Sequence, residues 1–137
     1  MLDVLAEKIS QHGVRNMTPV LLDLLADPPP AQRFDLIYTS MTLHHVPDTD
    51  AILRIFHGLL NPGGHLCIAD LDQEDGSFHG LDVDVHHGFE RAELGERAVA
   101  AGFQAIDFQT VFSIEKEQET GKRDYPVFLM SARSAAA

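Results

Sequence analysis

Two groups of side chains in this 137-residue sequence are suited to acid–base chemistry. The pair His44-His45 follows the apolar segment "FDLIY". The second group is a run of carboxylates at the end of the apolar segment "HLCIADL": Asp70, Asp72, Glu74 and Asp75. Because histidine titrates near neutral pH, His44 and His45 are candidates for a general base or for groups that orient an acceptor. The simpler interpretation is that they fill a loop beneath the next helix.

A third group lies in the segment "DVDVHH". Its acidic and imidazole side chains alternate, and an extended backbone would place several of them on one face: Asp82, Asp84, His86 and His87. Carboxylates with imidazoles suit a divalent metal. We favour a solvated loop and predict no metal site. His87 is also a candidate general base that reaches the acceptor.

The elements that position these groups follow from apolar periodicity and from turn residues. Helices are expected at 2–12, at 52–60 with Asp48 or Thr49 as the cap, and at 92–101. Strands are expected at 20–22, 34–38, 65–71, 105–114 and 125–133, the last two forming an antiparallel hairpin. The break Asn61-Pro62-Gly63-Gly64 ends a helix and returns the chain to the sheet.

This order predicts an α/β fold. Strand–helix–strand units imply right-handed crossovers and a mainly parallel sheet with helices on both faces. Ligands bind such sheets beyond the carboxyl ends of the strands, so residues 38–46 and 70–75 should share one functional edge. We expect a single domain over residues 1–133 and a disordered tail over residues 134–137.

Composition restricts the classes of partner. The formal net charge is −11, which argues against nucleic acid because phosphate binding needs a positive face. The single cysteine, Cys67, cannot form an intrachain disulfide. No secretory signal or membrane span is visible, so we expect a cytoplasmic protein without a membrane partner.

The segment "RFDLIYTSMTLHHVPDTDAILRIFHGLLNPGGHLCIADL" resembles the central half of a class I S-adenosylmethionine-dependent methyltransferase. That family has an "FD-apolar" strand, a ligand-contacting loop, an amphipathic helix, "L-x-PGG" and another strand. "HHGFERAELGERAVAAGF" and "YPVFLMSAR" resemble its last helix and closing strand. The resemblance implies a truncated Rossmann-like methyltransferase sheet, mainly parallel with an antiparallel C-terminal hairpin strand. It also implies S-adenosylmethionine as cofactor and a small-molecule acceptor.

The resemblance also implies roles for individual residues. Asp23 corresponds to the carboxylate that accepts a hydrogen bond from the adenine amino group, and Leu24 to the residue that packs against the ring. The loop that touches the methionine part of the cofactor corresponds to Thr39, Ser40 and Met41. Asp70 corresponds to the end of the fifth family strand, beside the acceptor. Together with the histidines proposed above from their chemistry, the catalytic candidates are His44, His45, Asp70 and His87.

Two family features are not found in this sequence. These are the "acidic-x-Gly-x-Gly" loop after the first strand and the acidic residue that holds the ribose. Gly13 is the only glycine among the first 50 residues. Because the family's strand order is 3-2-1-4-5-7-6, we expect an open edge at the fourth family strand. We also expect that Met1 is an internal methionine of a longer protein and that cofactor affinity is poor.

Two functions from different classes follow. The first is methyl transfer to an unidentified small-molecule acceptor, incomplete in this chain. The alternative is a non-catalytic remnant of the fold that binds a partner chain through the open sheet edge. We expect a homodimer or a rearranged N-terminus. A Rossmann-type oxidoreductase is less favoured, because the sequence has no G-x-G-x-x-G.

Overall fold

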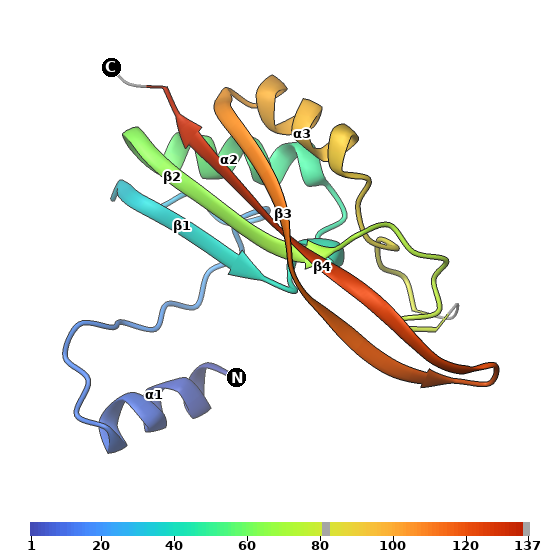
Figure 1. The fold of residues 1–137 in the computed structure, drawn as a ribbon. Coiled ribbons are helices and arrows are strands. Elements are labelled where there is room, and N and C mark those ends of the chain that lie inside the picture. Colours follow the sequence, from blue (N-terminus) through green and yellow to red (C-terminus); the bar gives the residue numbers. More distant parts are fainter. Residues whose placement is uncertain (81–82, 136–137) are drawn as a thin grey trace.

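The computed structural model describes residues 1–80 and 83–135. A four-stranded sheet carries two helices on one face, and a third helix lies apart near the N-terminus (Figure 1). The elements in chain order are α1 (Leu2–Gln11), β1 (Phe34–Ser40), a 3-10 helix (Leu43–His45), α2 (Thr49–Leu59), β2 (Leu60–Leu71), α3 (Arg91–Ala100), β3 (Phe103–Gln118) and β4 (Gly121–Ser134).

The strand order is β1-β2-β4-β3. β1 pairs in parallel with β2, whereas β4 is antiparallel to both of its neighbours, β2 and β3. Three strands therefore run in one direction, and only β4 opposes them. This confirms the predicted sheet, which is mainly parallel with an antiparallel C-terminal strand.

The main core lies between the sheet and the pair α2 and α3. Successive residues of a strand point to opposite faces, and alternate residues of β2 and β4 turn inward here. The apolar stripes of the two helices pack on this face, as their spacing predicts. The buried residues that form this core include Ile52, Leu53, Phe56, Leu66, Ile68, Leu94, Ala98, Phe128 and Met130. The Asp48 side chain caps α2 by accepting from the Ala51 amide at 3.0 Å, which confirms one of the two predicted caps.

A smaller cluster forms on the opposite face of the sheet, where β2 ends. Leu71, Phe78, Tyr125 and Val127 are buried together. Phe78 belongs to the loop that follows β2, so this cluster anchors that loop against β4. The loop is thereby held close to the carboxyl ends of β1 and β2.

The N-terminal part departs from the prediction. Val20–Leu22 is not a strand: it has no partner in the sheet, and Val20 and Leu21 are exposed. A β-strand requires backbone hydrogen bonds to a neighbouring strand, and no strand of the sheet pairs with these three residues. The predicted helical layer on the second face is also wrong for the described residues, because α1 has no buried residue. Leu24 alone reaches the main core.

β1 is one of the two edge strands of the sheet, and β3 is the other. Within residues 1–80 and 83–135, β1 pairs only with β2, which confirms the expected open edge. Leu36 is 52% exposed and Tyr38 is 75% exposed, although both are strand residues.

The predicted tail begins inside the last strand. Ser134, predicted as tail, pairs with Phe103 and is buried. The last two tail residues, 136–137, lie outside the described residues. No helix in the part of the chain that the structure describes is long and apolar enough to cross a membrane.

The break Asn61-Pro62-Gly63-Gly64 forms a bulge at the start of β2. Phe34 pairs with Leu60, whereas Leu36 pairs with His65, so the four break residues have no counterparts along β1. A side chain at Gly64 would contact the Asn61 carbonyl oxygen at 2.9 Å and the Asp35 carbonyl oxygen at 3.2 Å. Both are backbone atoms, which cannot move aside without disturbing the β1–β2 pairing.

We therefore expect Gly64→Ala to lower the free energy of unfolding by about 1–3 kcal/mol, through overpacking against backbone. The matched control is Gly58→Ala in α2, where an added methyl group meets open space. Alanine is the better helix former, so this control should be neutral or stabilising by up to about 1 kcal/mol. Urea denaturation of the two variants measures both effects. Equal stability of the two variants would contradict the tight contact at Gly64.

Candidate functional site

The two strand ends predicted to share a functional edge are joined by Asp70. The 3-10 helix after β1 brings His44 against Asp70, the penultimate residue of β2. The His44 Nδ1 atom lies 2.8 Å from Asp70 Oδ1, and the His44 backbone N–H donates to Asp70 Oδ2 at 3.0 Å. The Leu71 N–H also donates to Oδ1, at 2.7 Å. His44 is 1% exposed and Asp70 is 0% exposed, so no bulk water competes for these bonds.

The carboxylate determines which nitrogen of His44 carries the proton. An ionised carboxylate only accepts hydrogen bonds, so His44 Nδ1 must hold the hydrogen that Asp70 accepts. In the neutral ring the lone pair then lies on Nε2. His44 is thus presented with one basic nitrogen directed away from Asp70.

That basic nitrogen faces a histidine that the sequence did not indicate. His79 Nε2 lies 2.8 Å from His44 Nε2, so the His79 Nε2–H donates to His44. His79 belongs to the loop after β2. Two observations explain its position: the adjacent Phe78 is buried in the second cluster, and Glu74 Oε2 accepts from the Gly76 and Phe78 amides.

The surroundings keep His79 uncharged near neutral pH. Burial lowers the pKa of His79 below its ordinary value of 6.5, and the neighbouring His44, His45 and Lys116 lower that pKa further. Glu74 opposes them by raising the same pKa, as the smallest of these influences. Lys116 is held nearby because its Nζ donates to the Phe78 carbonyl at 2.6 Å.

His45 completes a histidine cluster, by which we mean His44, His45 and His79. The ring centroid of His45 lies 4.1 Å from that of His44 and 5.3 Å from that of His79. Each residue offers one ring nitrogen, and these nitrogens all lie within 4.8 Å of one another. His45 is exposed, His79 is half-buried and His44 is buried, so the cluster runs from the surface into the protein.

The "DVDVHH" segment does not join this cluster among the described residues. Asp84 and His87 are exposed, and His86 Nε2 contacts the Val46 carbonyl oxygen at 2.8 Å. Asp82 lies outside the described residues. The catalytic role of His87 stays a prediction, and the structure places this side chain at the surface.

The other carboxylates near Asp70 have structural partners. Asp72 forms a two-pronged ion pair with Arg91, with N–O distances of 2.7 and 2.8 Å. Asp75 bonds to Ser77 and Arg123, and these hydrogen bonds hold the pKa of Asp75 well below its ordinary value. Asp70 is therefore the acidic residue of this run that contacts the histidine cluster.

An apolar pocket of about 570 Å³ lies beside the 3-10 helix. Three of the predicted cofactor residues line it: Asp23, Leu24 and Thr39. Asp23 Oδ1 accepts from the Leu25 amide at 3.0 Å, which shapes a turn at the rim. Ser40 and Met41 are not among the lining residues, and Met41 packs against the second cluster instead. The cofactor roles of all five residues stay predictions.

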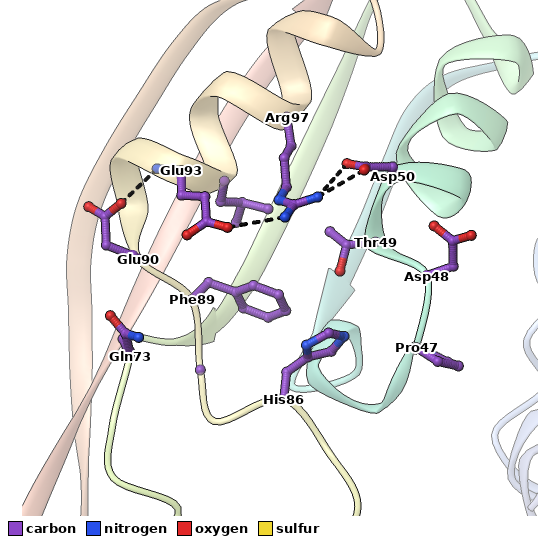
Figure 2. A pocket seen from close by; sticks show the side chains of 12 residues that line it. Pro47, Asp48, Thr49, Asp50, Gln73, His86, Phe89, Glu90, Glu93 and Arg97 are labelled. Carbon is purple, nitrogen blue, oxygen red and sulfur yellow. Dashed lines mark hydrogen bonds and ion pairs between the residues drawn. The ribbon is translucent and has the colours of Figure 1, made fainter.

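A second pocket, of about 320 Å³, lies between the starts of α2 and α3 (Figure 2). Its walls are polar, but the charges are paired: Arg97 bonds to Asp50 at 2.8 and 2.9 Å and to Glu93 at 3.1 Å. Glu90 caps α3 by accepting from the Ala92 and Glu93 amides, and Figure 2 draws the bond to Glu93. These groups fasten the two helices together, and we assign them no ligand.

Comparison with known proteins identifies the family. The family model described as "Methyltransferase domain" matches residues 2–116. An uncharacterized methyltransferase of Schizosaccharomyces pombe is 31% identical over 143 residues, covering 97% of this chain and 49% of that protein.

Solved structures show the same fold. The crystal structure of a Bacillus halodurans protein described as a methyltransferase superimposes with a TM-score of 0.79 at 15% identity. The match covers 98% of this chain and 79% of that one. The structure of phosphoethanolamine N-methyltransferase 2 of Haemonchus contortus, in complex with S-adenosyl-L-methionine, superimposes with a TM-score of 0.75 at 14% identity. The match covers 98% of this chain and 41% of that one. The chain spans about half the length of the Schizosaccharomyces pombe relative. It belongs to the methyltransferase domain family.

Proposed function

We propose that this chain forms the acceptor side and the adenine side of an S-adenosylmethionine-dependent methyltransferase that methylates a hydroxyl group of a small molecule. The observation that carries this proposal is the buried His44–Asp70 pair at the carboxyl ends of β1 and β2, next to the apolar pocket. Membership in the methyltransferase family supports the reaction class. The pair supports an acceptor that must lose a proton, since methyl transfer to a nucleophile without one needs no base.

The proposed chemistry is an in-line displacement. The acceptor oxygen attacks the methyl carbon of the sulfonium, a carbon–oxygen bond forms, and the carbon–sulfur bond breaks to give S-adenosylhomocysteine. The hydroxyl proton must leave at the same time. Because His44 is almost fully buried, the acceptor reaches His79 first: the basic nitrogen of His79 takes the proton and the His79 Nε2–H passes to His44 Nε2. Asp70 stabilises the resulting imidazolium.

The apolar pocket fits the adenine end of the cofactor. Leu24 supplies an apolar wall, and Asp23 lies at the rim with a carboxylate. A carboxylate accepts several hydrogen bonds, so its bond to the Leu25 amide leaves capacity for an adenine amino group. The "acidic-x-Gly-x-Gly" loop is not found in this sequence, so its backbone contacts to the cofactor are not supplied here. We therefore propose weak cofactor binding by this chain.

Calorimetric titration with S-adenosylhomocysteine, without divalent metal, tests the cofactor site. We expect weak one-to-one binding that Asp23→Asn weakens about 10–150-fold, because a charge-assisted hydrogen bond contributes roughly 1.5–3 kcal/mol. Asp107→Asn, an exposed carboxylate on β3, is the matched control and should leave the affinity unchanged. No heat at millimolar ligand, or equal affinity of the two variants, would refute this assignment of the pocket.

A second candidate function is association through the open edge. The exposed apolar side chains of β1, with Leu36 and Tyr38 the most exposed, favour pairing with another strand. A second copy of this chain is the partner that gives a homodimer. Under this alternative the sheet fold is retained for assembly and not for catalysis.

Sedimentation equilibrium tests this alternative. We expect the wild-type chain to associate and the double variant Leu36→Lys/Tyr38→Lys to remain monomeric, because two charges on the edge would oppose strand pairing. The control is Val99→Lys, on the exposed face of α3, which should associate as the wild type does. A wild-type chain that is monomeric at high concentration would exclude homodimerisation through β1.

A further inference from the structure

We propose that the histidine cluster, His44, His45 and His79, binds one divalent transition-metal ion such as Zn²⁺. The proposal goes beyond methyl transfer and does not depend on it. Three imidazole nitrogens that lie within 4.8 Å of one another match the ligand type and number of open zinc sites, in which water or substrate takes the fourth position.

Metal binding requires the separations between the three nitrogens, which are up to 4.8 Å, to change to those of a tetrahedral site. Three nitrogens bound to a tetrahedral Zn²⁺ at about 2.0–2.1 Å lie about 3.3 Å from one another. The Nε2 atoms of His44 and His79 are 2.8 Å apart, so an ion between them would separate the two rings slightly. His45 is exposed and His79 is half-buried, so both side chains have room to close around the ion.

Asp70 orients the His44 ring for metal binding through its hydrogen bond to Nδ1. A metal-bound histidine usually donates its other ring N–H to a carboxylate or carbonyl, which fixes the tautomer and raises the basicity of the ligand. His44 meets this description before any metal binds, because its Nδ1 lies 2.8 Å from Asp70 Oδ1 and Asp70 is 0% exposed. The Nε2 atom of His44 therefore already carries the free lone pair that a metal ion needs.

The proton balance is simple. His79 uses its Nε2–H to contact His44, and that proton must leave before His79 Nε2 binds a metal. Because the His79 ring is neutral, this proton moves to Nδ1 by tautomerisation, and binding through Nε2 then releases no net proton. The facing charges are Lys116, which opposes a cation, and Glu74, which attracts one. The net charge of −11 favours cations over the whole surface, so weak binding elsewhere must be separated experimentally.

Metal binding and proton uptake compete for one atom. A metal on His44 Nε2 removes the lone pair that would accept a proton in the proposed methyl transfer. The metal would then hold an acceptor oxygen or water in its open position. The metal-bound site and the site that accepts a proton are therefore mutually exclusive. Metal affinity reports the first state, and methyl transfer reports the second.

The test is calorimetric titration of the full chain with Zn²⁺, together with the visible absorption of the Co²⁺-loaded chain. We expect one tight site with the intense absorption of four-coordinate Co²⁺. His79→Gln and His45→Gln should each weaken Zn²⁺ binding at least 10-fold, and Asp70→Asn should weaken it about 10–100-fold. His87→Gln and His65→Gln, which replace exposed histidines outside the cluster, should leave the affinity unchanged.

Because His44 and Asp70 are buried, circular dichroism of each metal-free variant must first show a native fold. His45 and His79 are the decisive positions, since their side chains are accessible and their replacement is compatible with folding. The proposal is overturned if Zn²⁺ fails to bind, or if it binds equally well to His79→Gln and His45→Gln. Loss of binding in His87→Gln or His65→Gln instead would place the ion at another, adventitious position and would also overturn it.

Discussion

The Asp70 carboxylate is the group on which the arrangement of this edge depends. Burying an ionised carboxylate is costly unless it is paired and hydrogen-bonded. Asp70 is 0% exposed and is satisfied by the amide and ring of His44 and by the Leu71 amide. These bonds tie the end of β2 to the 3-10 helix after β1. Loss of the His44 ring or of the Asp70 carboxylate would leave the other buried group without one of its hydrogen-bond partners, so the two elements form one structural unit.

The other parts of the edge are arranged around that unit. The loop after β2 is anchored by Phe78 in the second cluster, by the Asp75–Arg123 ion pair and by the Ser77 hydroxyl against the Tyr125 hydroxyl at 2.6 Å. This anchoring delivers His79 to His44 Nε2. The site thus combines a rigid, buried interior with more accessible imidazoles at the surface. Such a gradient suits a group that must exchange protons or a metal ion with molecules from solvent.

Much of the fold is predictable from the sequence because local signals agree with the global arrangement. Asp48 caps α2, the apolar stripes of α2 and α3 face the sheet, and the short connection after Gln118 produces the hairpin. The strand predicted at 20–22 fails for a physical reason: strand formation depends on a partner, and no apolar run reveals whether its partner exists. The same dependence leaves β1 open and α1 without buried contacts.

The site is only partly predictable. His44, His45 and Asp70 are indicated because each follows or ends an apolar run, and parallel strands bring such ends together. His79 gives no signal, since its position depends on tertiary anchoring of a polar loop. The carboxylates Asp72 and Asp75 look equally suited to chemistry in the sequence, but their arginine partners are distant along the chain, and only the fold shows the pairing.

The proposed chemistry of the site depends most directly on the protonation state of His44. Long-range ¹H–¹⁵N correlation spectra of the imidazole nitrogens, recorded near neutral pH without metal, report this state for each of the eight histidines. The His44 signals can be assigned from their change in Asp70→Asn. We predict a protonated Nδ1 and an unprotonated Nε2 for His44. A His44 ring that carries its proton on Nε2, or that averages between the two tautomers, would contradict the central role of Asp70.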